Sequence, residues 1–131
     1  MTFLDVSDNE ISVLPPKFGE LKWLKVARLS RNHIADMRPF VGLTACEELG
    51  LSRNAVTQIP DTISHMTSLV TLDLSHNGLV ALNPAICSVS ICCVSAFCTL
   101  THYHHHYLHR ILVQKIKYLR TVDISRTSEK R

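Results

Sequence analysis

Hydrophobic and polar residues alternate in short segments that recur along residues 1–88. Four such segments align without gaps over nine residues each: 1–9, 24–32, 46–54 and 69–77. The segments are apolar or small at their first, fourth and sixth positions, and each ends in Asn. Alternation of this kind is typical of a short strand with one buried face. We therefore predict four short strands, one in each segment, and we number positions within each unit from its first apolar residue.

The spacing of the units identifies the pattern further. The Asn residues are 23, 22 and 23 positions apart, apolar residues follow each of them at two and five positions, and Pro15 and Pro60 come directly afterwards. The pattern L-x-x-L-x-L-x-x-N-x-L-x-x-L-P resembles the leucine-rich repeat family in its intracellular, 22–23-residue form. It looks most like the repeats of Ras-associated and cell-polarity scaffolds, although residues 40–43 are closer to the phosphatase-regulator type.

The resemblance implies a fold in the α/β class. We expect a leucine-rich-repeat solenoid with a short parallel β-sheet on its concave face and an irregular, 3₁₀ or helical convex side. No repeat buries its own core, so stability must come from stacking. In this family the Asn side chains satisfy the backbone of neighbouring units in a ladder. The ladder here would consist of Asn9, Asn32, Asn54 and Asn77.

The pattern breaks after residue 88. Residues 89–114 form a Cys/His-rich segment, and no repeat positions are evident near residue 100. Repeat-like positions return from residue 119, with Thr127 in place of the Asn. We therefore predict three parts: four repeats in 1–88, an insert in 89–114, and a partial fifth repeat with a basic tail in 115–131.

Two origins for residues 89–114 stay open. One is a genuine insertion on the convex side or at the loop edge. The other is a translated intron, because removing 89–114 joins Ser88 to Lys115 and restores a fifth repeat in register. The genomic sequence across this junction distinguishes them. Because Met1 already occupies a core position and no polar cap is visible, we also expect the chain to be a slice of a longer repeat array or a late-starting gene model.

The insert also contains the residues with metal-binding potential. Four Cys and five His lie between residues 87 and 109, and these are zinc ligands by type. However, no C-x₂-C pair is present, and the adjacent Cys92 and Cys93 are awkward for chelation by both. Neither a G-x-S-x-G elbow nor a phosphate-binding loop occurs. We therefore predict no metal, no cofactor and no catalytic residues.

Composition narrows the class of protein. A hydrophobic content of 46% excludes a disordered chain, and a net charge of +3 is too small to indicate nucleic-acid binding. The uncharged stretch Ile86–Leu100 is shorter than the roughly 20 residues that span a bilayer. The N-terminus lacks the basic and apolar regions of a signal peptide. We expect a cytoplasmic protein with reduced cysteines and no membrane span, and the sequence does not set its oligomeric state.

The family resemblance implies that the third, fifth, seventh and eighth positions of each unit lie on the concave face. Adjacent parallel strands lie about 4.8 Å apart, so residues in the same column become neighbours. This places Arg28, Arg31 and Arg53 in one cationic cluster, flanked by the acidic residues Asp5, Asp8 and Asp73. The candidate partner-binding residues are Arg28, Arg31, Arg53, Asp73 and His76. The competing interpretation is a solvated surface of weak ion pairs.

These features favour a non-catalytic protein–protein interaction module, an intracellular scaffold or adaptor that binds a protein partner on its concave face. The alternative is the targeting arm of a larger signalling enzyme, a kinase, cyclase or phosphatase, whose catalytic domain lies elsewhere.

Overall fold

The computed structural model describes residues 1–80, 83–88 and 93–95, all within the unit Met1–Thr99. Strands and 3₁₀ helices alternate along this part of the chain. In order they are β1 (Phe3–Asp5), η1 (Pro16–Glu20), β2 (Val26–Arg28), η2 (Arg38–Gly42), β3 (Glu48–Gly50), η3 (Asp61–His65), β4 (Thr71–Asp73), η4 (Pro84–Ser88) and β5 (Cys93–Ser95). Each of the first four units thus contributes one strand and one 3₁₀ helix.

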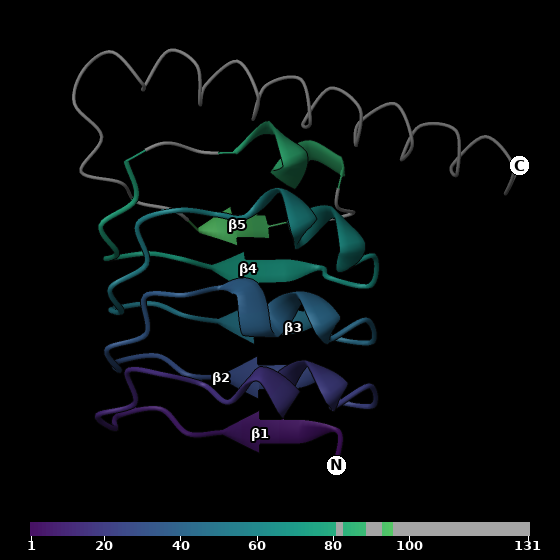
Figure 1. Cartoon of the computed structure of the whole chain (residues 1–131), viewed down its shortest axis with the longest axis horizontal. Helices are drawn as coiled ribbons and strands as arrows, with labels where there is room; N and C mark the ends of the chain where they lie inside the picture. Colours follow the sequence, from purple (N-terminus) through teal and green to yellow (C-terminus); the bar gives the residue numbers. More distant parts are fainter. Residues whose placement is uncertain (81–82, 89–92, 96–131) are drawn as a thin grey trace, which may run out of the picture. The chain divides into compact units, whose positions relative to one another are not determined.

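The strands form one parallel sheet in sequence order, β1-β2-β3-β4-β5. Figure 1 shows them stacked one above the next. The register aligns equivalent positions of successive units, so that Phe3 pairs with Val26 and Val26 pairs with Glu48. The predicted parallel sheet and repeat phasing are therefore confirmed.

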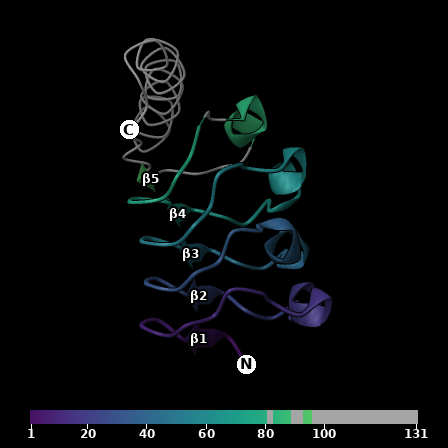
Figure 2. The same cartoon turned by 60° about the vertical axis from the view of Figure 1, so that its left-hand side comes forward.

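The core fills the space between the sheet and the 3₁₀ helices, which lie on opposite sides of the described units (Figure 2). Residues at the first, fourth and sixth positions of the second, third and fourth units are fully buried: Leu24, Ala27, Leu29, Cys46, Leu49, Leu51, Leu69, Leu72 and Leu74. In the first unit the equivalent Leu4 and Val6 are only half-buried, because no strand precedes β1 in the sheet.

The 3₁₀ helices supply the opposite wall of the core. Phe18, Phe40 and Ile63 occupy equivalent places in η1, η2 and η3, and all three are buried. The rings of Phe18 and Phe40 meet edge to face, with centroids 5.5 Å apart. Proline lies at the start of η1 and η2, where it fixes φ and sacrifices no intrahelical hydrogen bond. Of the irregular, 3₁₀ or helical forms expected for the convex side, the described units have the 3₁₀ form.

Strand β5 departs from the expectation that the repeat stops at residue 88. Cys93–Ser95 pairs with β4 in the register of the other strands, and Val94 aligns with Leu72. Val94 fits the apolar fourth position, but Thr99 stands where the pattern has Asn, so the sequence pattern does not indicate a repeat here. The segment that we expected to stack on β4, residues 115–131, lies outside the described residues. The origin of residues 89–114 therefore stays a prediction.

Two further points concern membrane and metal sites. No helix in the described ranges is both long enough and apolar enough to cross a bilayer. Within the same ranges, no group of His, Cys, Asp or Glu side chains is placed to hold a metal ion. The side chains of the Cys/His-rich segment lie outside the description.

Candidate binding surface

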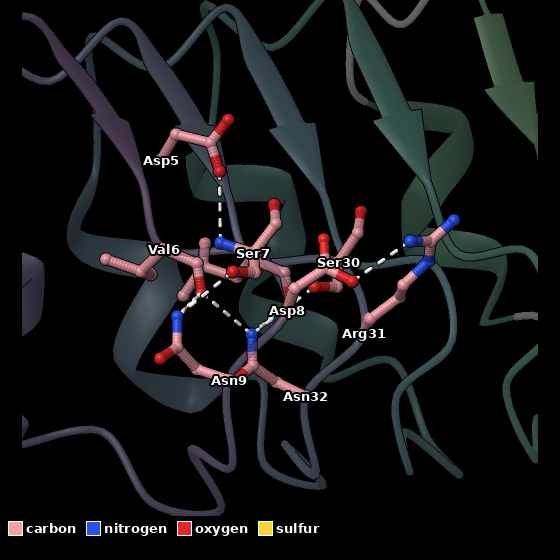
Figure 3. A network of polar contacts seen from close by, with 9 residues as sticks. Asp5, Val6, Ser7, Asp8, Asn9, Ser30, Arg31 and Asn32 are labelled. Atoms are coloured by element: carbon pink, nitrogen blue, oxygen red, sulfur yellow. Dashed lines mark hydrogen bonds and ion pairs between the residues drawn. The ribbon is translucent and has the colours of Figure 1, made fainter.

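Asparagine side chains connect each unit to the one before it. The amide nitrogen of Asn32 donates to the carbonyl oxygens of Val6 at 3.0 Å and Leu29 at 3.1 Å. Its amide oxygen accepts the N–H of Ile11 at 2.9 Å. One side chain therefore satisfies backbone groups of two units, and Figure 3 shows its bond to Val6.

Asn54 and Asn77 make the same set of hydrogen bonds one and two units further along. Asn9 differs because its unit lies at the edge of the described sheet. Among the described residues its amide nitrogen donates only to the carbonyl oxygens of Val6 and Ser7, within its own unit, and the side chain is exposed. These residues are structural, since they hold the turn that follows each strand.

The residue before each of these Asn residues has a left-handed backbone. Asp8, Arg31, Arg53 and His76 have φ between 53° and 57°. Non-glycine residues adopt this region at an energetic cost, which is smallest for Asp and Asn. The left-handed residue turns the chain out of the strand and leaves an exposed side chain at the eighth position of every unit. Arg is an unusual choice for such a position in two successive units.

The register places the predicted concave columns side by side. Asp5, Arg28, Gly50 and Asp73 follow one another across the fifth column. The backbone conformation is the same in each of these units, but the side chains of the fifth column differ: the first is acidic, the second is basic, the third is glycine and the fourth is acidic.

Arg28 has partners that sequence analysis missed. Its Nε donates to Oε1 of Glu48 at 2.9 Å, and its guanidinium carbon lies 5.5 Å from the centroid of the Phe3 ring. Glu48 lies diagonally across from Arg28 in the next strand, a geometry in which long side chains interact. The hydrogen bond to Glu48 raises the pKa of Arg28 above its ordinary value. In the sequence, the one signal for this pair is that the fifth position of one strand lies diagonally across from the third position of the next.

The other two arginines differ in their pairing. Nη1 of Arg31 contacts Oδ1 of Asp8 at 3.0 Å, and both side chains are exposed (Figure 3). Across the residues that the structure describes, Arg53 makes no ion pair. The predicted single cationic cluster is therefore divided: two arginines are neutralised by local carboxylates, and Arg53 keeps its charge unpaired.

The aspartates of the fifth column cap the backbone instead of flanking the arginines as ion-pair partners. Oδ1 of Asp5 accepts the N–H of Ser7 at 3.0 Å, and Oδ1 of Asp73 accepts the N–H of Ser75 at the same distance. The bond from Ser7 holds the pKa of Asp5 below its ordinary value, with a smaller contribution from the charge of Arg28. Asp73 therefore already has a hydrogen-bonding role within its own turn.

Cys46 is the one thiol whose side chain the structure describes. It occupies a first core position, is fully buried, and its Sγ donates to the carbonyl oxygen of Glu48 at 3.3 Å. Burial raises its pKa to about 11, so the neutral thiol persists at physiological pH. Cys46 is thus a packing residue whose thiol is buried away from the surface.

The described fold defines a class: a solenoid of short repeats with one parallel sheet, an asparagine ladder and a 3₁₀ convex side. Residues 24–79 match the family described as leucine rich repeat. Residues 24–79 therefore carry leucine-rich repeats, and the described units have the leucine-rich repeat fold.

Three known proteins illustrate the similarity. The chain is 31% identical over 97 residues to mouse leucine-rich repeat serine/threonine-protein kinase 1, covering 68% of this chain and 5% of the relative. It is 33% identical over 81 residues to the adenylate cyclase of Schizosaccharomyces pombe, covering 59% of this chain and 5% of that relative. A leucine-rich repeat protein of Leptospira interrogans has the same fold, with a TM-score of 0.75 and 24% identity over 85% of this chain and 29% of that one. The chain thus spans only a small part of these curated relatives.

Proposed function

We propose that this chain is a non-catalytic protein–protein interaction module, a scaffold or adaptor in intracellular signalling. Its partner binds the concave face through residues that include Arg28, Arg31, Arg53, Asp73 and His76. One observation carries the proposal: a strictly repeating backbone presents a non-repeating set of exposed charges on this face. Repeated side chains maintain the fold, so variation among equivalent exposed positions is where specificity for a partner resides. The intracellular setting is part of this proposal and is supported by the resemblance of the 22–23-residue repeats to the intracellular form.

The experiment compares charge reversal on two faces of the same protein. Full-length chain captures its partner from cell extract, and the association rate is then measured with purified components. Arg31→Glu combined with Arg53→Glu should slow association, and the effect should shrink as salt rises. The Debye length falls from about 10 Å at 0.1 M to about 3 Å at 1 M, so long-range attraction is screened.

Lys17→Glu combined with Lys22→Glu is the matched control, because Lys17 lies in η1 and Lys22 follows it on the return side. Both double variants change the net charge equally, and thermal melts establish that each is folded. Equal loss of binding from the two variants would reject the concave face and leave a generic charge effect.

A second candidate function is the targeting arm of a larger signalling enzyme. It is favoured by the names of two relatives, a serine/threonine-protein kinase and an adenylate cyclase. In that case the concave face would bind a protein that positions the enzyme. Sequencing the full-length transcript tests this alternative, and a catalytic domain in the same open reading frame would establish it over the free-standing adaptor.

A further inference from the structure

A carboxylate caps the strand exit in two of the four units whose side chains are described. In the first unit Oδ1 of Asp5 accepts the N–H of Ser7, and in the fourth unit Oδ1 of Asp73 accepts the N–H of Ser75, each at 3.0 Å. Figure 3 shows the first of these bonds. The donor is the backbone N–H of the seventh position, and this backbone is repeated in every unit. The two units therefore mark where a carboxylate sits against the concave face.

The third unit lacks this carboxylate, because its fifth position is Gly50. Among the described residues the N–H of Ser52, the equivalent donor, has no hydrogen-bond acceptor. The space is open: a Cβ at Gly50 would have the Ser30 hydroxyl as its nearest neighbour, at 3.5 Å, an ordinary contact distance. The concave wall thus has a gap at Gly50 beside an unused backbone donor and a hydroxyl group.

The same unit also carries a positively charged side chain at its eighth position. Arg53 follows Ser52 directly, is exposed, and makes no ion pair with the described residues. The second unit has no acidic residue at its fifth position either, but its situation differs. Arg28 fills that place and is bound to Glu48. Arg31, the counterpart of Arg53, is neutralised by Asp8. Only the third of these four units combines an open place, an unused donor and a free positive charge.

We propose that an acidic side chain of the protein partner occupies this place. Its carboxylate lies over Gly50, accepts the N–H of Ser52 as the Asp5 and Asp73 carboxylates do in their units, and pairs with Arg53. A carboxylate is the fitting group because it is the one that the neighbouring units already place there. Hydrogen bonds to an ionised acceptor are stronger than neutral ones, so this contact would anchor the complex. The inference rests on the proposed function, since it requires a partner on the concave face.

The site can be tested without knowing the partner. Sodium acetate is titrated into the ¹⁵N-labelled full-length chain, with sodium chloride as the ionic-strength reference. The amide resonance of Ser52 should move saturably with acetate, whereas those of Ser7 and Ser75 should stay in place because aspartates already cap them. Sodium phosphate should shift Ser52 less than acetate does. The carboxylate site is overturned if acetate shifts the Ser52 amide resonance no more than those of Ser7 and Ser75. It is also overturned if phosphate shifts the Ser52 resonance more than acetate does.

Two substitutions of glycine sharpen the test. Gly50→Asp supplies the carboxylate from the chain itself and should abolish the response of Ser52 to acetate. Gly78→Asp adds the same charge where a Cβ meets Thr57 Cγ2 at 3.6 Å, outside the fifth column, and should leave the response unchanged. Retention of the full acetate response in Gly50→Asp would contradict the proposed placement.

Partner binding separates the two proposals. With the captured partner, Gly50→Asp should weaken binding at least tenfold, and Gly78→Asp should not. If Gly50→Asp binds normally while Arg31→Glu with Arg53→Glu associates slowly, the concave-face function stands and the carboxylate site is rejected. If neither concave variant differs from the return-side control, the concave-face function fails, and the carboxylate site fails with it.

Discussion

At the scale of single residues, the asparagine ladder is the most demanding feature of the molecule. Asn77 is buried, and its side chain satisfies the N–H of Val56 and the carbonyl oxygens of Leu51 and Leu74. A hydrophobic side chain of similar size could fill the same volume but would leave these backbone groups unpaired. Buried polar groups without partners are expensive, so each repeat depends on one amide in one orientation.

Asn77→Ala should therefore lower the free energy of unfolding by about 3 kcal/mol, since stranding a buried donor or acceptor costs about 1–3 kcal/mol. Asn9→Ala is the control, because Asn9 is exposed and bonds only within its own unit. Its cost should be below about 1 kcal/mol. Urea denaturation of both variants makes the comparison, and equal destabilisation would show that the ladder does not couple the units.

The left-handed eighth position gives a second prediction at this scale. Arg53 has φ of 53°, a conformation that Asn adopts more readily than Arg. Arg53→Asn should raise the free energy of unfolding by up to about 1 kcal/mol while it weakens partner binding. Stability is measured by urea denaturation and affinity by titration with the captured partner. A variant that is less stable than the parent chain would show that the arginine is held by favourable contacts and not merely tolerated.

At the scale of elements, the 3₁₀ helices η1 and η2 approach each other through their backbones. A Cβ on Gly42 would lie 2.5 Å from the carbonyl oxygen of Gly19 and 2.8 Å from its Cα. Lys22 Nζ also donates to the carbonyl oxygen of Gly42, at 2.8 Å. No rotation of a side chain can relieve a clash with backbone atoms, so this contact requires glycine.

Gly42→Ala should consequently destabilise the chain by about 2 kcal/mol or more, as overpacking does in well-packed interiors. Gly78→Ala is the control for replacing a glycine without a backbone clash, because its Cβ would have the Thr57 methyl group as its nearest neighbour, at 3.6 Å. Differential scanning calorimetry should give a clearly lower Tm for Gly42→Ala alone. Similar melting temperatures for the two variants would mean that η1 and η2 are free to move apart.

The sequence predicted some of these elements and contacts and not others. Strand positions, register and the ladder follow from the periodicity, because each depends on local apolar spacing that the family pattern fixes. Strand β5 was not predicted because Thr99 replaces the Asn that ends each of the other units, although Val94 keeps the apolar fourth position. Repeat phasing places Glu48 diagonally across from Arg28, but it does not decide which of several nearby carboxylates the arginine pairs with.

At the scale of the whole molecule, stability is shared between stacked units. Leu49 in the third unit is fully buried, whereas Leu4, at the same position of the first unit, is half-buried. In a quasi-one-dimensional stack an inner unit has two neighbours and an end unit has one. The consequence of losing a leucine should therefore depend on where in the stack it lies.

Leu49→Ala should cost about 2–5 kcal/mol, the range for large-to-small changes in a full core, and should shift one cooperative transition as a whole. Leu4→Ala should cost less, because part of that side chain already contacts solvent. Thermal unfolding followed by circular dichroism measures both. If the two leucines prove equivalent, the first and third units experience the same packing and the stacking order described for the sheet is wrong.

The central claim is that the partner binds the concave face and not the return side. Hydrogen exchange of the full-length chain, measured alone and in complex with the captured partner, tests it most directly. The account predicts that the Ser52 N–H, which has no acceptor among the described residues, exchanges rapidly in the free chain and becomes protected in the complex. Amides of η1, η2 and η3 should keep the same exchange rates. Protection confined to those 3₁₀ helices, with Ser52 unchanged, would contradict the account.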